Sequence, residues 1–379
     1  MNTRSEVRQP RSRARLFRRT SAVGAVAALA VLALAVPPAL AAPPATTVVA
    51  SGLDNPRGIT VGADGRVYVA EAGTGEAGSG RVTVIAHGTT RTLVGGLPSA
   101  MAAEGDVTGP TNVAVSPQGK LVGLVGAGPQ MLDSRFDSLL RLQPGAAKSL
   151  ADVQAFVDDH PDTTDLDQPA NPTDSNAYGV AWVDANHYLV ADAANNTLLM
   201  VGPAGSVRRL AKFPNQVVST AGVPDFPVPF VPAEAVPTSV TIGPDGYAYV
   251  GELKGFPFTP GTSRVWRVSL NAHDVTCDAA ATGGQCSVYL DGLTAVTGLD
   301  FGPDGSLYVV SFAKHGLLAF FGAGVTDGAL YRVTGGVTTE LAPGELTLPG
   351  DVAVAPNGTV YLTNQSVFSG GGQVVTVAQ

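Results

Sequence analysis

The stretch "DNPRGITVGADGRVYVAEAG" (54–73) holds one complete structural unit of the chain. A turn at residues 54–56 precedes a short apolar strand at 59–61. An Asp64-Gly65 hairpin turn then leads into a second strand at 67–70. Glu71 follows the second strand directly. Whether this acid has a function depends on how often the unit recurs and on which way its strands run.

The unit recurs five more times along the chain. The recurrences are "PTNVAVSPQGKLVGLV" (110–125), "AYGVAWVDANHYLVAD" (177–192), "PTSVTIGPDGYAYVGE" (237–252), "VTGLDFGPDGSLYVVS" (296–311) and "PGDVAVAPNGTVYLTN" (349–364). Their turns, at residues 65, 119, 186, 246, 305 and 358, are spaced 53 to 67 residues apart. A recurring unit of this length predicts a repeat architecture.

Further strand-like stretches follow most pairs, as "RVTVIA" and "RTLVGG" do in the first unit. Four strands per unit and six units predict an all-β fold, a six-bladed β-propeller. The last unit ends one strand short, and "TTVVAS" (46–51) is a strand without a partner. Pairing the two closes the ring and removes a sheet edge. An open solenoid is the alternative, but it requires capping units that the sequence does not contain.

The N-terminal segment differs in composition from the rest. Residues 1–19 hold seven Arg and one Glu, an apolar run covers 22–36, and Ala39-Leu40-Ala41 offers a cleavage site. This pattern predicts a signal peptide at 1–41, a mature propeller at 46–379 and secretion by the Sec rather than the Tat route. An uncleaved N-terminal anchor is the alternative.

Charge and cysteine content narrow the possible partners. Without residues 1–41, Lys+Arg falls from 23 to 16 and Asp+Glu from 31 to 30, giving a net charge near −14. Nucleic acid and anionic membrane surfaces are therefore not expected as partners. Cys277 and Cys286 flank a Gly-containing loop, which predicts a local disulfide in an exported protein.

The sequence resembles the NHL-type six-bladed propellers and, more closely, the ScyD/ScyE family of exported bacterial proteins. The likeness is sharpest in "DSNAYGVAWVDANHYLVADAANNTLLMVGPAGSVRRLAKFP" (174–214), "VPTSVTIGPDGYAYVGELKGFPFTPGTSRVWRV" (236–268) and "GLDFGPDGSLYVVSF" (298–312). The resemblance implies a propeller fold and export. It assigns no reaction, because most members of that family have none. Ser311 departs from the acid common at that position in the family.

In a propeller the first strand of each blade lines the central channel, and the second strand runs back antiparallel. The residues that precede first strands and follow second strands therefore gather on one face of the ring, opposite the hairpin turns. The candidate ligand-binding residues of this face are Arg57, Glu71, Asn112, Tyr178, Asp192, Glu252, Asp351 and Asn364. Ser239 and Thr297 occupy equivalent places before their strands.

Carboxylates that converge in this way suit Ca²⁺ or another divalent metal. The candidate ligands are Glu71, Asp192, Glu252 and Asp351. Gluconolactonase-like propellers use such an arrangement. The alternative is that these polar side chains cap loops of the ring, with Arg57 paired to Glu71. We expect Lys254 and Lys314 to be solvated and His315 to lie on an exposed loop, although His315 also lies within reach of the pocket rim.

Two regions look specialised. The insertion at 126–176 predicts a short amphipathic helix with Ser149 as its N-cap, followed by an acidic run (158–168) that is solvated or holds Ca²⁺. The segments "VPDFPVPFVP" (223–232) and "LKGFPFTPG" (253–261) carry aromatic residues between prolines. They either roof the pocket or seal the edge between blades.

Two classes of function remain open. The first is a scaffold that binds a small molecule or an extracellular protein in a polar pocket at one end of the channel. The second is a metal-assisted hydrolase, lyase or cyclase acting on a small metabolite in that pocket. A quinoprotein-like sugar dehydrogenase is a weaker third, because the sequence lacks a basic, His-bearing cluster for such a cofactor. The fold alone decides nothing between them.

Overall fold

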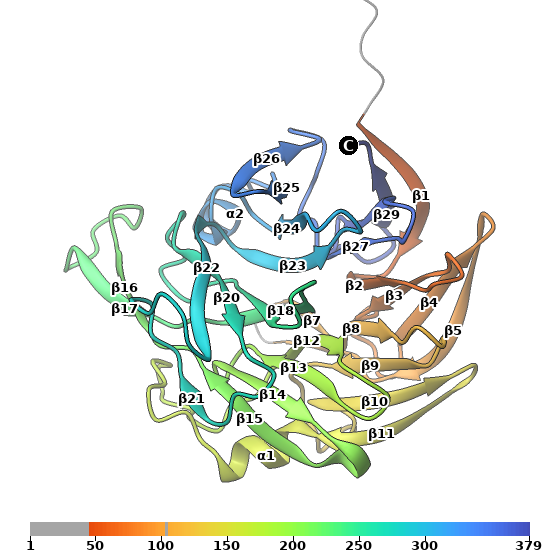
Figure 1. Ribbon diagram of the computed structural model, residues 1–379, viewed down its shortest axis with the longest axis horizontal. Helices are drawn as coiled ribbons and strands as arrows, with labels where there is room; N and C mark the ends of the chain where they lie inside the picture. The colour runs from red at the N-terminus through yellow and green to blue at the C-terminus, as the bar shows by residue number, and fades with distance from the viewer. Residues whose placement is uncertain (1–44, 103–104) are drawn as a thin grey trace, which may run out of the picture. The chain divides into compact units, whose positions relative to one another are not determined.

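A computed structural model describes residues 45–102 and 105–379. The predicted signal peptide (1–41) lies outside the described residues. Pro44–Gln379 form one compact unit. In this unit six four-stranded antiparallel groups of strands surround a central channel, which confirms the predicted six-bladed propeller (Figure 1).

The blades follow one another in chain order. Blade 1 consists of β2 (Pro56–Val61), β3 (Val67–Glu71), β4 (Gly80–Ala86) and β5 (Thr89–Leu97). Blade 2 consists of β8 (Pro110–Val115), β9 (Leu121–Val125), β10 (Ser138–Gln143) and β11 (Ala146–Asp152). Blade 3 consists of β12 (Ala177–Trp182), β13 (Tyr188–Asp192), β14 (Thr197–Val201) and β15 (Val207–Lys212), with β21 (Val275–Thr276) added in parallel.

The second half of the ring repeats the pattern. Blade 4 consists of β18 (Pro237–Ile242), β19 (Ala248–Glu252), β20 (Ser263–Val268) and β22 (Cys286–Leu293). Blade 5 consists of β23 (Val296–Phe301), β24 (Leu307–Ser311), β25 (Ala329–Thr334) and β26 (Val337–Leu341). Blade 6 consists of β27 (Val352–Val354), β28 (Val360–Asn364), β29 (Gly372–Val377) and β1 (Thr46–Leu53).

The first described strand closes the ring, as predicted. β1 pairs antiparallel with β29 from Thr46↔Val377 to Leu53↔Gly372, so blade 6 takes its outer strand from the opposite end of the chain (Figure 1). The carboxylate of Glu345 accepts hydrogen bonds from the backbone N–H groups of Ala45 and Thr46, both at 2.9 Å, which holds the start of β1. Because β1 supplies the outer strand, blade 6 has four strands like the other blades.

The recurring Asp-Gly turn has a local physical cause. In the first unit the Gly62 N–H donates to the Arg66 carbonyl at 2.8 Å, and the Asp64 side chain accepts from the Arg66 N–H at 3.1 Å. Gly65 sits at φ +77°, a left-handed conformation that glycine adopts without strain. The same backbone bond recurs in the other five hairpins, for example from Gly302 to Ser306 at 2.8 Å. The turn residues thus set the register of each strand pair.

The hydrophobic core is divided among the contacts between blades. Each of six clusters combines apolar side chains from two neighbouring blades; one joins Tyr68 of blade 1 to Leu140 of blade 2, and another joins Ala50 of blade 6 to Ile59 of blade 1. A blade therefore buries both faces only when it has a neighbour on each side. This requirement explains why an open end would be costly and why β1 returns to blade 6.

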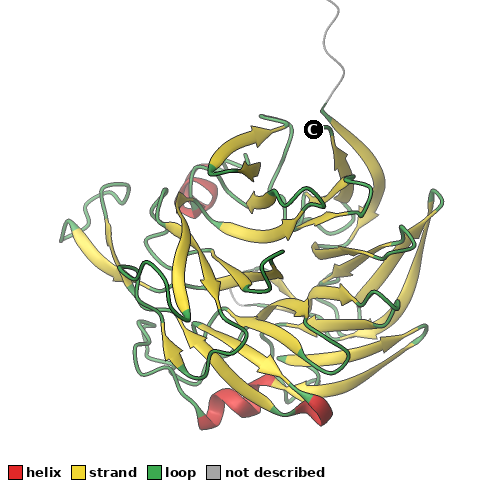
Figure 2. Cartoon of the chain, in the orientation of Figure 1, coloured by secondary structure: helices red, strands yellow, loops and turns green. Residues whose placement is uncertain are grey.

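Strands make up nearly all of the ring, and the helices are short (Figure 2). Two hairpins form separate two-stranded sheets outside the six blades, β6 (Ala100–Met101) with β7 (Val107–Thr108) and β16 (Gln216–Ser219) with β17 (Phe230–Ala233). The helices are α1 (Val153–Asp159), α2 (Leu317–Ala323) and the 3₁₀ turn η1 (Pro203–Gly205).

The predicted cap of the helix in the insertion is wrong. Helix α1 begins at Val153, and the Asp152 carboxylate caps it by accepting from the Ala155 N–H at 3.0 Å. Ser149 lies in β11, because that strand continues to Asp152 through its pairing with β10.

The predicted disulfide between Cys277 and Cys286 is confirmed and links the segment after β21 to the start of β22. No helix in the described part of the chain is long and apolar enough to cross a membrane.

Candidate ligand-binding cavity at the mouth of the channel

The structure distributes the eight predicted site residues among three places. Two of them, Arg57 and Tyr178, line a cavity at one end of the channel. Two others, Asn112 and Asp351, line the channel itself. The remaining four, Glu71, Asp192, Glu252 and Asn364, are buried at the ends of the second strands of their own blades. The expected single convergence on one pocket is therefore replaced by three separate environments.

Glu71 is fully buried and satisfied within blade 1. Its carboxylate accepts from the Asp54 N–H at 2.7 Å, from Arg81 Nε at 2.9 Å and from Arg81 Nη2 at 2.5 Å, and also from the Thr83 hydroxyl. Arg81, on the third strand, is thus the partner of Glu71. The predicted alternative pairing with Arg57 is wrong, because Arg57 pairs with Asp106 at 2.7 Å.

Asp192 and Glu252 have equally complete surroundings. Asp192 accepts from Ser175 Oγ at 2.8 Å and from the N–H groups of Asn176 and Asn195 at 2.9 and 3.1 Å. Glu252 accepts from Lys254 Nζ at 2.7 Å and from Trp266 Nε1 at 2.5 Å. Lys254 is only 1% exposed, so the expectation that it is solvated is wrong.

These contacts do not fit a shared Ca²⁺. The oxygens of Glu71, Asp192 and Glu252 are engaged by donors of their own blades, and a salt bridge neutralises Glu252. Asn364 likewise accepts from the Thr347 N–H at 2.8 Å. The four predicted metal ligands form no group whose oxygens lie close enough for one ion within the described residues.

A different acidic group does gather outside the ring. Single carboxylate oxygens of Asp165, Asp167 and Glu234 lie within 4.8 Å of one another. Burial, with smaller contributions from Asp167 and Asp165, raises the pKa of Glu234 to about 7. The first two residues belong to the predicted acidic run, but acidic side chains on a surface often cluster without an ion, and we assign none to this group.

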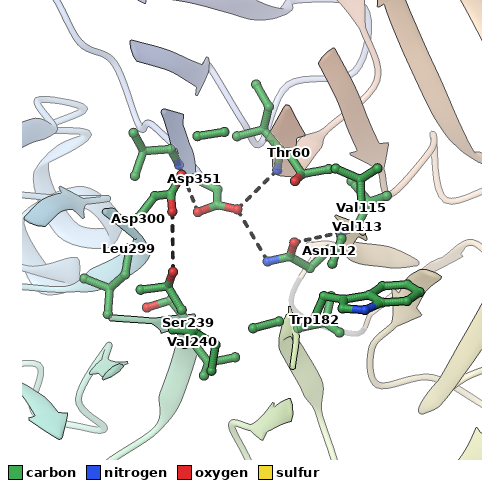
Figure 3. A pocket seen from close by; sticks show the side chains of 18 residues that line it. Thr60, Asn112, Val113, Val115, Trp182, Ser239, Val240, Leu299, Asp300 and Asp351 are labelled. Atoms are coloured by element: carbon green, nitrogen blue, oxygen red, sulfur yellow. Dashed lines mark hydrogen bonds between the residues drawn. The ribbon is translucent and has the colours of Figure 1, made fainter. Parts of the chain in front are cut away.

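Inside the channel, Asp351 and Asn112 point toward one another (Figure 3). Asp351 Oδ2 accepts from Asn112 Nδ2 at 3.4 Å and from the Ile59 N–H at 3.1 Å. Asp300 plays a similar part, accepting from the Val354 N–H at 2.8 Å and from Thr241 Oγ1 at 3.4 Å. These bonds join the innermost strands of five blades, so the two acids brace the ring.

The two channel acids hold protons more tightly than ordinary carboxyl groups. Burial raises the pKa of Asp351 to about 7, and the neighbouring Asp300 adds to the effect. Burial also raises the pKa of Asp300 to about 6, although backbone N–H groups oppose it. The channel cavity that they line measures about 220 Å³.

A larger cavity of about 540 Å³ lies at the starts of the first strands. We call it the mouth cavity. Its wall is strongly apolar and includes Phe312, Leu317, Phe320, Phe321 and Phe368. Helix α2 supplies three of these side chains, and two of them, Leu317 and Phe320, pack in a separate apolar cluster with Leu253 and Phe258. The cavity has the apolar wall and few polar groups that are typical of small-molecule sites.

The polar side of the mouth cavity centres on Arg57. Its Nη2 donates to Asp106 Oδ1 at 2.7 Å and to the Val107 carbonyl at 3.1 Å. Burial alone would lower the pKa of Arg57, but Tyr178 and Asp106 outweigh it and the pKa is raised. Burial raises the pKa of Tyr178 despite Arg57, so its hydroxyl stays neutral. The cavity therefore presents the Arg57–Asp106 ion pair and one neutral tyrosine hydroxyl.

Thr297 adds an unused polar group to this wall. Its hydroxyl is buried and has no hydrogen-bond partner among the described residues, although buried hydroxyls normally have one. Thr297 lies at the start of β23 and lines the mouth cavity.

Several residues of the cavity were not predicted as site residues. The phenylalanines of α2 belong to "GLLAFFGAG" (316–324). This apolar run was visible in the sequence and could have indicated these residues as part of the site. Of the two proline-aromatic segments, 253–261 contributes Leu253 to the cavity and places Phe258 6.3 Å from Phe321, ring to ring.

His315 is exposed and lies 3.6 Å from Asp327, so it matches the expected exposed loop residue. Lys314 is mostly buried and pairs with Glu340 at 3.2 Å, contrary to the expectation of a solvated charge.

Comparison with known proteins supports the fold. No protein-family model and no curated protein matches the sequence. The PQQ-bound aldose sugar dehydrogenase of Streptomyces coelicolor is 15% identical, with 89% of this chain and 99% of that chain covered and a TM-score of 0.54. The apo-form soluble aldose sugar dehydrogenase of Escherichia coli is 12% identical, with 88% and 99% covered and a TM-score of 0.51.

A putative gluconolactonase gives a similar result. It is 12% identical, with 88% of this chain and 91% of that chain covered and a TM-score of 0.50. At such identities the likeness establishes the propeller fold alone.

Proposed function

We propose that this chain is a secreted β-propeller of the ScyD/ScyE type that binds a small molecule in the mouth cavity. The observation that carries the proposal is the combination, in one cavity, of an aromatic wall, a buried arginine that is ion-paired with Asp106, and an unpartnered threonine hydroxyl. The ligand would place a flat apolar body against Phe312, Phe320 and Phe321 and direct a polar group toward Arg57 and Thr297.

Export is part of the proposal. The basic, apolar and small-residue order of residues 1–41 supports a signal peptide. The disulfide between Cys277 and Cys286 is compatible with an oxidising compartment.

Binding without turnover explains the site better than metal-assisted catalysis. The structural neighbours include dehydrogenases and a putative lactonase, so this fold does support enzymes. Three of the four carboxylates predicted for the metal-assisted reaction, Glu71, Asp192 and Glu252, are however engaged as acceptors inside their blades. Among the described residues, the four predicted ligands form no group whose oxygens could hold one ion.

The neutral dye N-phenyl-1-naphthylamine, which fluoresces in apolar sites, tests the cavity directly. Phe321 is 68% exposed and lines the cavity, whereas Phe230 is 61% exposed and lies on β17 outside it. We expect Phe321→Ser to weaken dye binding about tenfold, because an apolar contact surface is lost. The matched Phe230→Ser variant should change it by less than about twofold. Equal effects of the two variants, or no saturable binding to the native protein, would refute the mouth cavity as a ligand site.

A further inference from the structure

A second cavity lies at the opposite ends of the first strands, on the face that carries the hairpin turns. It measures about 640 Å³ and extends over blades 1, 2 and 3. Its lining includes Arg66, Arg91, Lys120 and Arg141 and contains no acidic side chain. We call it the basic groove. It is unexpected in a chain whose net charge beyond residue 41 is near −14.

Most cations of this groove differ from the others in having no acidic partner, and Arg66, which pairs with Asp64 at 3.1 Å, is the exception. Of the sixteen Lys and Arg residues among the described residues, eleven form ion pairs. The five that do not are Arg91, Lys120, Arg141, Lys148 and Arg208. Arg208 donates instead to the carbonyls of Ala272 and Leu270. Three of the other four line the basic groove.

Lys148 extends the same basic surface. It lies directly opposite Arg141 in the pairing of β10 with β11. Like charges directly opposite one another on antiparallel strands repel each other, so this pair lowers the stability of the folded state. An anion placed between the two side chains would remove that repulsion.

The cations are spread along the groove instead of meeting at one point. Lys120 stands at the hairpin turn of blade 2, Arg141 on its third strand and Lys148 on its fourth. Since neighbouring strands lie about 4.8 Å apart, these positions span roughly 10 Å. Such spacing suits an extended ligand with several negative charges better than a single small anion.

The inner end of the groove is aromatic. Trp182 lines both the groove and the channel cavity, and its ring lies 4.8 Å from that of Tyr188 in an edge-on arrangement. Asn186, in the neighbouring turn, adds an amide to this end. An aromatic face beside an amide can pack against a sugar ring and bond its hydroxyl groups.

We propose that the basic groove binds an acidic oligosaccharide. Carboxylates along the saccharide pair with Arg91, Lys120, Arg141 and Lys148, and one sugar ring packs against Trp182. Arginine suits this task because its planar group bonds carboxylates in a bidentate manner. A long nucleic acid is disfavoured, because the strongly negative remainder of the protein would repel it.

Calorimetric titration with tetragalacturonate at low salt tests the proposal. The groove variant Arg91→Gln/Arg141→Gln/Lys148→Gln should weaken binding at least about tenfold. The matched variant Arg209→Gln/Arg267→Gln/Arg332→Gln removes the same charge from paired cations of blades 3, 4 and 5, and should change binding by less than about twofold. Added salt should weaken native binding, and the neutral galactotetraose should not bind.

Four outcomes would overturn the proposal: no binding of tetragalacturonate, equal loss in both variants, equal binding of galactotetraose, or tighter groove-dependent binding of an eight-nucleotide DNA strand. The last would replace the saccharide with a nucleic acid. The groove variant should keep its affinity for N-phenyl-1-naphthylamine, because the mouth cavity lies at the other ends of the strands. That readout separates this proposal from the proposed function.

Discussion

At the scale of single residues, three of the polar side chains at the ends of second strands have the same structural role. Glu71, Asp192 and Asn364 each accept a hydrogen bond from the backbone N–H of the segment that enters their blade. Ser311 makes the same connection with reversed polarity, because its hydroxyl donates to the Thr294 carbonyl at 2.5 Å. Ser311 therefore keeps the link between the end of the second strand and the entering segment, with the side chain as donor instead of acceptor.

The buried Glu252–Lys254 pair gives a prediction at this scale. Glu252→Gln removes the negative charge and leaves Lys254, which is 1% exposed, without compensation. We expect the free energy of unfolding to fall by about 3–5 kcal/mol, measured by urea denaturation. The double variant Glu252→Gln/Lys254→Met removes both charges and should recover most of the loss. Equal stability of the single variant and the native protein would contradict this account.

Residue positions were easier to predict from the sequence than residue partners. Period-two alternation and the Asp-Gly turn placed Glu71 correctly at the end of a second strand. The pattern could not reveal that Arg81, on the third strand, would reach back to it, because cross-strand partners depend on register and on side-chain length. Convergence on a metal was predicted from position alone. Glu71, Asp192 and Glu252 instead accept hydrogen bonds from donors of their own blades, and Asp351 accepts from donors of blades 1 and 2.

At the scale of elements, β1 is the strand that closes the six repeated units into a ring. It contributes Ala50 and Leu53 to the cluster between blades 6 and 1, and it pairs with β29 over its whole length. The missing strand of the last unit was visible in the sequence because each unit otherwise has four. Helix α2 was not predicted, because Gly316 provides no side-chain cap and seven residues carry too little periodicity to distinguish a helix from a strand.

Removal of β1 should therefore expose an edge and an apolar surface together. We expect a chain beginning at residue 54 to lose its cooperative thermal transition and to aggregate, as followed by circular dichroism and size-exclusion chromatography. A synthetic peptide of residues 44–53 added in excess should restore the transition, since it supplies the same strand. A monomeric truncated chain with an unchanged melting temperature would show that closure by β1 contributes little.

At the scale of the whole molecule, the ring carries several buried acids whose pKa values are raised. Burial is the first cause for Asp137, at about 8, and for Asp351, at about 7. Asp192 and Asp174 add repulsion at Asp137. In the unfolded chain these groups titrate near pH 4. The native protein thus binds more protons than the unfolded chain between about pH 4 and pH 8.

This difference fixes the sign of the pH dependence. Stability falls as pH rises wherever the native state binds more protons, so the melting temperature should drop between pH 5 and pH 8.5, by about 5 °C or more. Asp137→Asn supplies a neutral side chain of nearly equal size in place of the buried carboxyl. It should leave the melting temperature at pH 5 nearly unchanged, raise it at pH 8.5 and flatten the slope. Asp278→Asn, in an exposed loop, is the matched control and should keep the native slope. A melting temperature that rises from pH 5 to pH 8.5, or an Asp137→Asn slope equal to the native one, would show that these acids are ionised at little cost inside the ring.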